Sequence, residues 1–275
     1  MPELPEAETI ARDLDRAIAG LTIASVHVAR PDVLRGVTAE GFVERTTGTA
    51  VLRCWRRAKL VVLDLSTADR IVVQPRFTGA LLIDAGSLPE QERRYSTLSL
   101  RLSDGRALHY RDIRRLGTVA LMSPQRFEHY VAKLGIEPLD PELSAERLSA
   151  LLRGSRQAVK KLLMDQRVLA GVGNIYANEA LWRAGIDPSR EARRLSVEEA
   201  RRLLDALQGV LRESIAARGT SFRDYRDASG ARGGFVEQLA VYGRGGLPCP
   251  RCGARLVATH AVDGRATVFC ARCQD

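Results

Sequence analysis

The stretch MPELPEAET, residues 1–9, begins the chain and is followed by a pattern that predicts a helix. Pro5 suits the first turn of a helix, and the acidic side chains of Glu6 and Glu8 suit its positive end. Apolar residues then recur at helical spacing: Ala7, Ile10, Ala11, Leu14, Ala17, Ile18 and Leu21.

Pro2 is small enough to direct removal of Met1, which would leave a secondary amine at the N-terminus. An α-amino group titrates near ~7.7–8.0, so part of it is unprotonated and nucleophilic at neutral pH. The positive potential at the start of a helix favours loss of its proton. The alternative is an ordinary helix N-terminus with acidic residues and no chemistry, which this stretch alone favours.

Length and charge set further limits. With 275 residues, of which 45% are hydrophobic, the chain can bury a core and hold two domains. We expect a cytoplasmic protein without disulfides, since it has no signal peptide and no apolar run that could span a bilayer. A net charge of +9 suits nucleic acid or an anionic membrane. The alternative explanation of this charge is a compositional bias of the source genome, since arginine greatly outnumbers lysine.

The first half after Gly20 has period-two hydrophobicity, which predicts an antiparallel sandwich or barrel behind the leading helix. Ser103-Asp104-Gly105 predicts a hairpin turn between two strands. The expected strands are Leu21–Val28, Ala50–Arg56, Leu60–Leu65, Arg70–Gln74, Gly79–Ile83, Thr97–Leu102, Ala107–Tyr110 and Thr118–Met122.

Three loops and one cysteine of this half invite interpretation. Arg56–Lys59 is a basic cluster that could hold phosphates, although a solvated turn is favoured. Arg111–Gly117 places Leu116 beside two arginines, as a minor-groove wedge requires, or is a surface loop with one buried leucine. Gln74–Gly79 is a third loop, with an apolar tip. Cys54 has no metal partner at a suitable spacing and is expected to be buried.

The second half is predicted to be helical after a proline-containing linker, Leu134–Pro141. Ser144 could cap one helix, Gln157–Met164 forms another, and Ser196–Glu199 is a capping box before a long amphipathic helix. Gly171-Val172-Gly173-Asn174 is a tight turn before a helix through Ala184. Such a turn can bind phosphate, or it can join two helices without any ligand. The spacing of the two glycines favours neither interpretation.

The cysteine pattern near the C-terminus is the strongest local signal. Cys249, Cys252, Cys270 and Cys273 form C-x2-C-x17-C-x2-C, which matches one tetrahedral structural zinc per chain. Two disulfides are the alternative, which a cytoplasmic chain disfavours. Leu256–Thr259 and Ala266–Phe269 predict a hairpin between the pairs.

Together these motifs resemble the formamidopyrimidine-DNA glycosylase and endonuclease VIII family. The resemblance covers the whole chain in order, and Leu4 favours the formamidopyrimidine branch because endonuclease VIII usually has glycine there. The matching segments are Pro2–Glu6, Arg56–Lys59, Arg114-Arg115, Gly171–Glu179 (GVGNIYANE), Val241–Arg244 and the four cysteines.

The resemblance implies an α+β fold with DNA held between domains. An antiparallel β-sandwich with a leading helix would span residues 1–133, a linker 134–143, a helix–two-turn–helix domain 144–240 and a zinc finger hairpin 241–275. It implies a monomeric bacterial glycosylase and abasic-site lyase, nucleoid-associated when on DNA. Duplex DNA with oxidised purines or abasic sites would be its substrate.

The resemblance also assigns catalytic roles. Pro2 would be the nucleophile on sugar C1′ and Glu3 the general acid at the sugar ring. Lys59 would hold phosphate and assist elimination. Lys160, Asn174 and Arg265 would hold the phosphates flanking the lesion, and Arg265 would assist the second elimination.

Further residues are implied to contact DNA. They include Glu6, Tyr176 and Tyr95, which stands where the family usually has histidine, and Thr220–Gly234 would cover the extruded base. The residues that fill the gap would be Phe77, Arg114 and Leu116, where the family usually has methionine, arginine and phenylalanine. Gln74-Pro75-Arg76 also departs from the usual His-Leu-Gly. The preferred lesion and opposite base therefore stay open.

Three alternatives remain. One is endonuclease VIII-like excision of oxidised pyrimidines, and another is a damaged-DNA-binding protein that has lost the chemistry. Intact Pro2, Glu3 and Lys59 argue against the second of these. A basic RNA-binding or ribosomal protein is a remote third, since helix–two-turn–helix units occur there as well.

Overall fold

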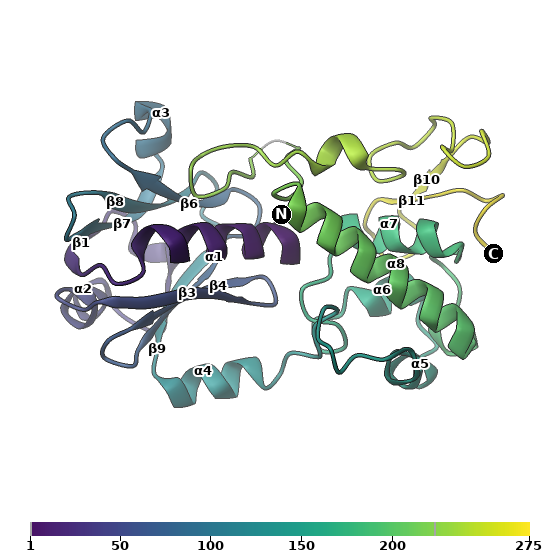
Figure 1. The fold of residues 1–275 in the computed structure, drawn as a ribbon, viewed down its shortest axis with the longest axis horizontal. Coiled ribbons are helices and arrows are strands. Elements are labelled where there is room, and N and C mark those ends of the chain that lie inside the picture. The colour runs from purple at the N-terminus through teal and green to yellow at the C-terminus, as the bar shows by residue number, and fades with distance from the viewer. Residues whose placement is uncertain (1, 223) are drawn as a thin grey trace. The chain divides into compact units, whose positions relative to one another are not determined.

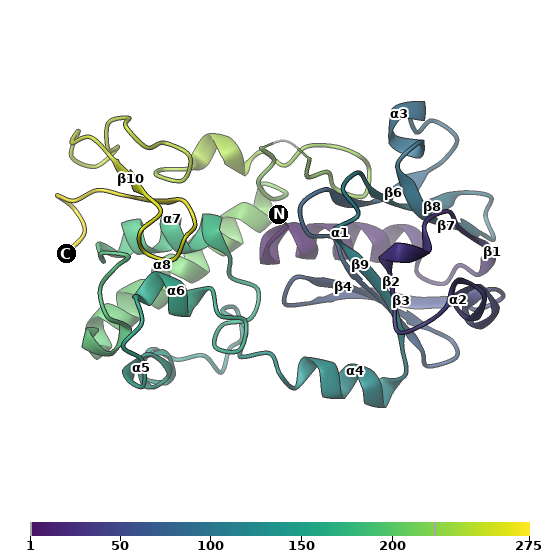
Figure 2. The same ribbon diagram turned by 180° about the vertical axis from the view of Figure 1, so that it is seen from behind.

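A computed structural model describes residues 2–222 and 224–275, and the chain in it divides into two compact units. The first unit contains the residues up to Ala132 together with Ile215–Val236, and the second contains Lys133–Ser214 and Glu237–Asp275. Figures 1 and 2 show the ribbon from opposite sides. In the described part of the chain, no helix has the length and apolar character needed to cross a membrane.

The first unit contains two sheets. In spatial order, the four-stranded sheet is β1 (Ile23–Val28), β7 (Ser96–Leu102), β8 (Ala107–Asp112) and β6 (Gly79–Asp84). The five-stranded sheet is β2 (Leu34–Arg35), β9 (Thr118–Met122), β5 (Arg70–Gln74), β4 (Leu60–Leu65) and β3 (Val51–Arg57). All neighbours pair antiparallel except the short β2, which is parallel to β9. The predicted α+β fold with its sandwich is therefore confirmed.

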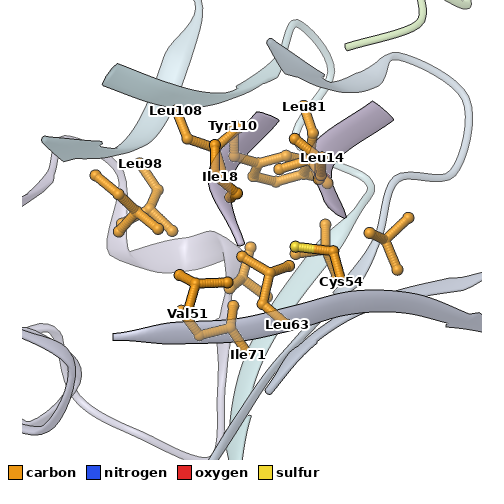
Figure 3. Packing of buried hydrophobic residues seen from close by; sticks show 14 of the residues in the cluster. Leu14, Ile18, Val51, Cys54, Leu63, Ile71, Leu81, Leu98, Leu108 and Tyr110 are labelled. Carbon is orange, nitrogen blue, oxygen red and sulfur yellow. The ribbon is translucent and has the colours of Figure 1, made fainter. Parts of the chain in front are cut away.

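Helix α1 (Leu4–Ile18) contributes its apolar face to the core between the sheets. Leu14 and Ile18 lie between the side chains of the two sheets (Figure 3). Full burial of one such side chain contributes about 1.5–3 kcal/mol, more than the helix propensity of any residue except proline, so packing holds this helix in place. The labelled neighbours from the sheets are Val51, Cys54, Leu63, Ile71, Leu81, Leu98, Leu108 and Tyr110.

Several short elements of this unit have no counterpart in the predicted pattern: η1 (Pro31–Val33), β2, α2 (Ala39–Thr46), α3 (Glu90–Arg93) and α4 (Pro124–Val131). Two of them do have start signals in the sequence. The Thr38 hydroxyl accepts the Gly41 N–H at 3.1 Å, and the Ser123 hydroxyl accepts the Arg126 N–H at 3.4 Å. These helices were missed because they are too short to show a helical period.

The second unit is built from helices and one hairpin. Its long helix begins with the predicted capping box, in which Ser196 and Glu199 exchange hydrogen bonds of 2.7 and 3.2 Å. The elements are α5 (Ala145–Arg153), α6 (Val159–Leu163), α7 (Asn174–Ala184), η2 (Ala192–Arg194), α8 (Val197–Ala216), η3 (Phe235–Gln238), β10 (Val257–Thr259) and β11 (Thr267–Phe269).

The segment after α8 packs with the first unit, although the predicted boundaries placed residues 144–240 in one domain. Tyr225 and Ala228 join the core of the sandwich. The backbone N–H of Ile83 in β6 donates to the carbonyl of Ala228 at 2.9 Å. This returning segment brings a distant part of the sequence to the N-terminal stretch.

Candidate functional site

The start of α1 places two buried carboxylates directly after Pro2. Glu3 is the N-cap residue and Glu6 the third residue of the helix, and they form a capping box. The Glu3 N–H donates to Glu6 Oε2 at 2.7 Å, and the two residues are only 3% and 1% exposed. Pro2 is itself buried beside them. The predicted removal of Met1 concerns a residue outside the described part of the chain.

The second oxygen of Glu6 binds the returning segment. Glu6 Oε1 accepts the Thr220 N–H at 2.8 Å. Gly219, at φ +85°, precedes this bond, and a Cβ there would press on the side chains of both Glu6 and Tyr225. Burial, and then the Glu6 charge, raise the pKa of Tyr225, so this phenol stays protonated. The loop that we expected to cover an extruded base is therefore attached to Glu6 by its first residue, Thr220.

A buried aspartate organises the rest of this loop. Asp227 Oδ1 accepts three hydrogen bonds, from the backbone N–H groups of Ser229 and Ala231 and from the Ser229 hydroxyl. Its Oδ2 pairs with Arg218, whose guanidinium also reaches Asp13 of α1 at 2.5 Å. Burial alone would raise the pKa of Asp227, but the bonds from Ser229 and Arg218 outweigh it and lower the pKa.

None of the motifs described above predicts this arrangement of Arg218 and Asp227. A signal was present, because Asp-Ala-Ser-Gly at 227–230 is typical of a turn closed by an aspartate side chain.

In the basic hairpin between β3 and β4, Arg56 makes contacts within the protein and Lys59 is partly exposed. Arg56 is structural: its Nε binds Glu8 of α1 at 2.8 Å, its Nη1 donates to the Ala58 carbonyl, and its side chain is 9% exposed. Burial opposes ionisation of Glu8, but Arg56 and Arg12 outweigh it and lower its pKa. Lys59 follows Ala58 in the turn and is partly exposed. The ion pair thus fixes the hairpin that carries Lys59 against α1.

The predicted gap-filling residues lie on two loops, residues 75–78 and 112–117, which we call the wedge loops. Phe77 is 50% exposed and Leu116 39% exposed. The guanidinium of Arg114 lies 5.7 Å from the centre of the Phe77 ring. The structure therefore brings Arg114 to Phe77 from another loop and leaves Leu116 exposed on the same loop as Arg114.

Asp112 holds the wedge loops together. Its carboxylate binds the Thr78 hydroxyl on one loop and accepts the Gly117 N–H on the other at 2.8 Å. The Arg114 N–H donates to the Thr78 hydroxyl at 3.0 Å. A Cβ at Gly117 would collide with the Tyr110 hydroxyl, so only glycine permits this approach.

In the second unit, the glycine turn before α7 is tied to its own neighbours. The Gly171 N–H donates to Gln166 Oε1 at 2.8 Å, so this donor is already used within the protein. Asn174 begins α7 and is partly exposed, and its Nδ2 donates to the carbonyl of Ala266 at 3.0 Å. The turn thus places Asn174 at the loop that joins β10 to β11.

Lys160 differs from the expected phosphate contact. Its side chain is fully buried, and its ammonium donates to the Thr267 hydroxyl at 2.7 Å and the Ala266 carbonyl at 3.2 Å. Asp263 Oδ1 lies 3.4 Å from the same nitrogen. A phosphate cannot reach an ammonium in this position, so Lys160 holds the hairpin loop from inside.

Tyr176 also differs from the prediction. Its side chain is fully buried, and its hydroxyl shares a 2.6 Å hydrogen bond with Ser214. The ring therefore packs α7 against α8 and does not offer a surface for DNA.

Arg265 lies on the hairpin loop held by Lys160 and Asn174, and it is exposed. Its backbone N–H donates to Asp263 Oδ1 at 3.1 Å, and its guanidinium lies 3.6 Å from the sulfur of Met164. Its position agrees with a side chain presented to a polyanion.

The four cysteines converge as the zinc prediction requires. Their Sγ atoms all lie within 4.8 Å of one another, and β10 and β11 form the expected hairpin between the two pairs. Four thiolates fill a tetrahedral shell, which is typical of a structural zinc. The prediction of one zinc per chain is confirmed by this donor set and by a family match given below.

Glu179 was part of a quoted motif but had no predicted role. It is fully buried, and its carboxylate accepts the backbone N–H groups of Ala240, Val241 and Tyr242 at 2.8–2.9 Å. This buried carboxylate fixes the chain where it enters the finger.

Family models match three consecutive parts of the chain. The model described as formamidopyrimidine-DNA glycosylase N-terminal domain matches residues 1–119, and the formamidopyrimidine-DNA glycosylase H2TH domain matches 134–226. A zinc finger found in FPG and IleRS matches residues 246–275. The three matches follow the order expected from the motifs.

Similar whole proteins agree with these matches. A formamidopyrimidine-DNA glycosylase of Heliobacterium modesticaldum is 42% identical over the full length of both chains. A Lactococcus lactis Fpg in complex with abasic-site DNA superposes with a TM-score of 0.91 at 31% identity, covering 99% of each chain. The wild-type Lactococcus lactis protein with DNA containing N7-benzyl-Fapy-dG gives the same TM-score and identity over 100% of each chain.

Proposed function

The chain belongs to the formamidopyrimidine-DNA glycosylase family, and from this premise we propose that Pro2 is the nucleophile with which it excises oxidised purines from duplex DNA. The observation that carries the proposal is the burial of Pro2 beside the carboxylates of Glu3 and Glu6. The substrates are 8-oxoguanine and formamidopyrimidines. The similar complexes with abasic-site and Fapy-dG DNA support this substrate class.

The damaged nucleotide must leave the helix before its sugar can react, because the target atom is hidden within the duplex. Unstacking a base step costs a few kcal/mol, which side chains inserted in the gap offset. The wedge loops carry an exposed aromatic ring, a guanidinium and a leucine for this purpose. The loop after Thr220 then covers the extruded base.

The chemical step begins when the Pro2 amine bonds to C1′ and the bond from C1′ to the base breaks. The base leaves with the bonding electron pair, and the proton that the Pro2 nitrogen releases after attack balances the negative charge on the base. Glu3 protonates the ring oxygen as the bond from C1′ to that oxygen opens, which gives an iminium ion. The iminium acidifies the C2′–H bond, so loss of that proton expels the 3′ phosphate, and a second elimination expels the 5′ phosphate.

Phosphate binding comes from residues in both units in this proposal. Lys59 holds a phosphate near the sugar, while Asn174 and Arg265 hold phosphates flanking the lesion. A zinc held by the four cysteines would take no part in the chemical steps. It would stabilise the hairpin that carries Arg265, because ligand binding energy is folding energy in so small a module.

Borohydride trapping tests the mechanism. Reducing the iminium during turnover should leave a covalent protein–DNA adduct that peptide mapping places on Pro2, in chains that lack Met1. An extra residue before Pro2 should abolish trapping and nicking. Pro2→Gly should retain weak trapping at most. Full glycosylase activity with a blocked amine would refute the mechanism.

Glu3→Gln separates the two stages. It should suppress base excision but retain cleavage at a preformed abasic site, since that substrate has no glycosidic bond to break. Equal loss on both substrates would remove the general-acid role from Glu3.

A second candidate is excision of oxidised pyrimidines, which is favoured only by the departure of Phe77 and Leu116 from the usual gap-filling residues. Duplexes carrying one lesion each, scored for cleavage, decide between the two. Faster cleavage of pyrimidine than of purine lesions would support this candidate.

We further propose a monomer in the bacterial cytoplasm, associated with the nucleoid when it is bound to DNA. The functional segments in this proposal are residues 1–133, 134–143, 144–240 and 241–275. The net charge of +9 supports a DNA partner.

A further inference from the structure

A groove of about 490 Å³ opens on the first unit beside the wedge loops. Its lining comes from residues 29–30, 94–97, 112–113 and Arg115. The Asp112 N–H donates to the Tyr95 carbonyl at 3.1 Å, and the Thr97 carbonyl accepts two backbone N–H groups at 3.0 Å. Backbone hydrogen bonds therefore fix the floor of this groove.

Three arginines line the groove: Arg30, Arg94 and Arg115. In residues 2–222 and 224–275, the Arg94 side chain has no hydrogen-bond or ion-pair partner. Arg115 pairs with Asp32 at 2.9 Å, but both side chains are about half exposed, so the pair contributes little and can exchange for a phosphate. The only acidic lining residue is Asp112, which is 1% exposed and binds Thr78 and Gly117.

Apolar surface lies within the same groove. Tyr95 is 41% exposed and Ile113 is 42% exposed. An aromatic ring and an aliphatic side chain beside arginines are what a nucleotide requires, since the base stacks on the apolar faces and the phosphate meets the cations. The volume falls within the range of pockets that hold small ligands.

A second hollow of the same volume provides a contrast. It is lined by His27, Asp84, Arg93 and His109, among others, and contains no tyrosine, phenylalanine or tryptophan. Its arginines therefore have no tyrosine ring beside them, and it lacks the combination that fits a nucleotide.

The position of the groove identifies the strand. Ile113 and Arg115 flank Arg114, which we placed in the gap left by the extruded nucleotide. The base that faces this gap belongs to the opposite strand. The segments around Pro2, Lys59 and Thr220 that receive the lesion do not line the groove.

We propose that this groove binds a nucleotide of the strand opposite the lesion, with its base against Tyr95 and Ile113 and its phosphate at Arg94. The inference rests on the proposed function. It adds Arg30, Arg94 and Ile113 to the residues that bind DNA.

Two duplexes with the same tetrahydrofuran abasic analogue test the proposal. One has an intact opposite strand, and the other lacks the single nucleotide opposite the analogue. Arg94→Gln should bind the intact duplex about five- to tenfold more weakly and reduce the salt slope by about one. On the gapped duplex the loss should be less than about twofold.

Arg93→Gln is the matched control, because Arg93 is the last residue of α3, directly before Arg94, and lines the other hollow. It should bind both duplexes as the unmodified protein does. Ile113→Ser should weaken binding to the intact duplex without changing the salt slope, since it removes stacking and no charge.

The outcomes separate the two proposals. Equal loss on both duplexes for Arg94→Gln, or the same behaviour as Arg93→Gln, would overturn the groove assignment. Unmodified protein that fails to trap DNA at Pro2 would instead refute the proposed function.

Discussion

Glu6 shows how one side chain joins two distant parts of the chain. Its two carboxylate oxygens accept the N–H groups of Glu3 and Thr220, which are separated by more than 200 positions. A buried donor that loses its acceptor costs about 1–3 kcal/mol, so both bonds matter for the site. The same carboxylate caps α1 and fixes the start of the covering loop.

Glu6→Gln should therefore destabilise the protein by about 1–3 kcal/mol, because an amide offers one acceptor oxygen and turns a donor towards the other N–H. Thermal unfolding measures the loss, and limited proteolysis within residues 219–234 should speed up. Glu40→Gln, an exposed change on α2, should stay within about 0.5 kcal/mol. Unchanged stability and proteolysis for Glu6→Gln would contradict this role.

For the candidate site residues, the sequence predicts which residues are involved better than it predicts which of them are buried. Motifs predict roles for Pro2, Glu3, Phe77, Arg114 and Leu116, and the structure adds that Glu3 is buried and that Arg114 lies over the Phe77 ring. Burial does not follow from a motif. Lys160 and Tyr176 occur in recognisable segments, yet both point inward, because the partners that bury them lie 38–107 positions away.

Among the elements, α6 and the finger hairpin are joined through Lys160. The side chains of Lys160 and Asp263 are 0% and 4% exposed. Removing one member of a buried ion pair costs about 3–5 kcal/mol, because it leaves the other charge uncompensated. The loop that carries Arg265 depends on this pair and on the hydrogen bond from Asn174.

Lys160→Met should lower the free energy of unfolding by about 3–5 kcal/mol in chemical denaturation, with zinc still bound. Lys161→Met, on the exposed face of the same short helix, should change the free energy of unfolding by less than about 0.5 kcal/mol. If Lys161 contacts a phosphate, this variant should also lower the salt slope of DNA binding. Adding Asp263→Asn to Lys160→Met should recover part of the loss. Additive losses in the double variant would disprove the coupling.

The elements themselves were largely predictable. Strands β4, β5 and β9 have the boundaries expected from alternation, because turn residues limit each of them. Helices α2, α3 and α4 were missed, since four to eight residues cannot show a helical period. The return of residues 215–236 to the sandwich depends on tertiary contacts that no local pattern records.

At the scale of the whole molecule, the reactivity of the five cysteines can show whether zinc is bound and whether the sandwich core is folded. Four converge at the finger, and Cys54 lies in the sandwich core at 6% exposure. Burial, and then nearby aspartates, raise the pKa of the Cys54 thiol, so its reactive thiolate is scarce.

Thiol titration should therefore proceed in stages. Zinc-loaded native protein should show almost no reactive thiol. A chelator should release about one zinc per chain and make the four finger thiols reactive. The Cys54 thiol should react only after unfolding. Loss of zinc should also abolish DNA binding. Five reactive thiols in active, metal-free protein would contradict the zinc site.

The discontinuity of the first unit has a consequence for how the protein is made. Tyr225 and Ala228 complete a core whose other members precede residue 122. At about 5–20 residues per second, the ribosome needs roughly 4–16 seconds to make the intervening helical part, Lys133–Ser214. Throughout that interval the nascent sandwich lacks its last segment. Glu6, made early, gains the Thr220 N–H only after residue 220 has emerged, so the hydrogen bonds of this carboxylate are completed near the end of synthesis.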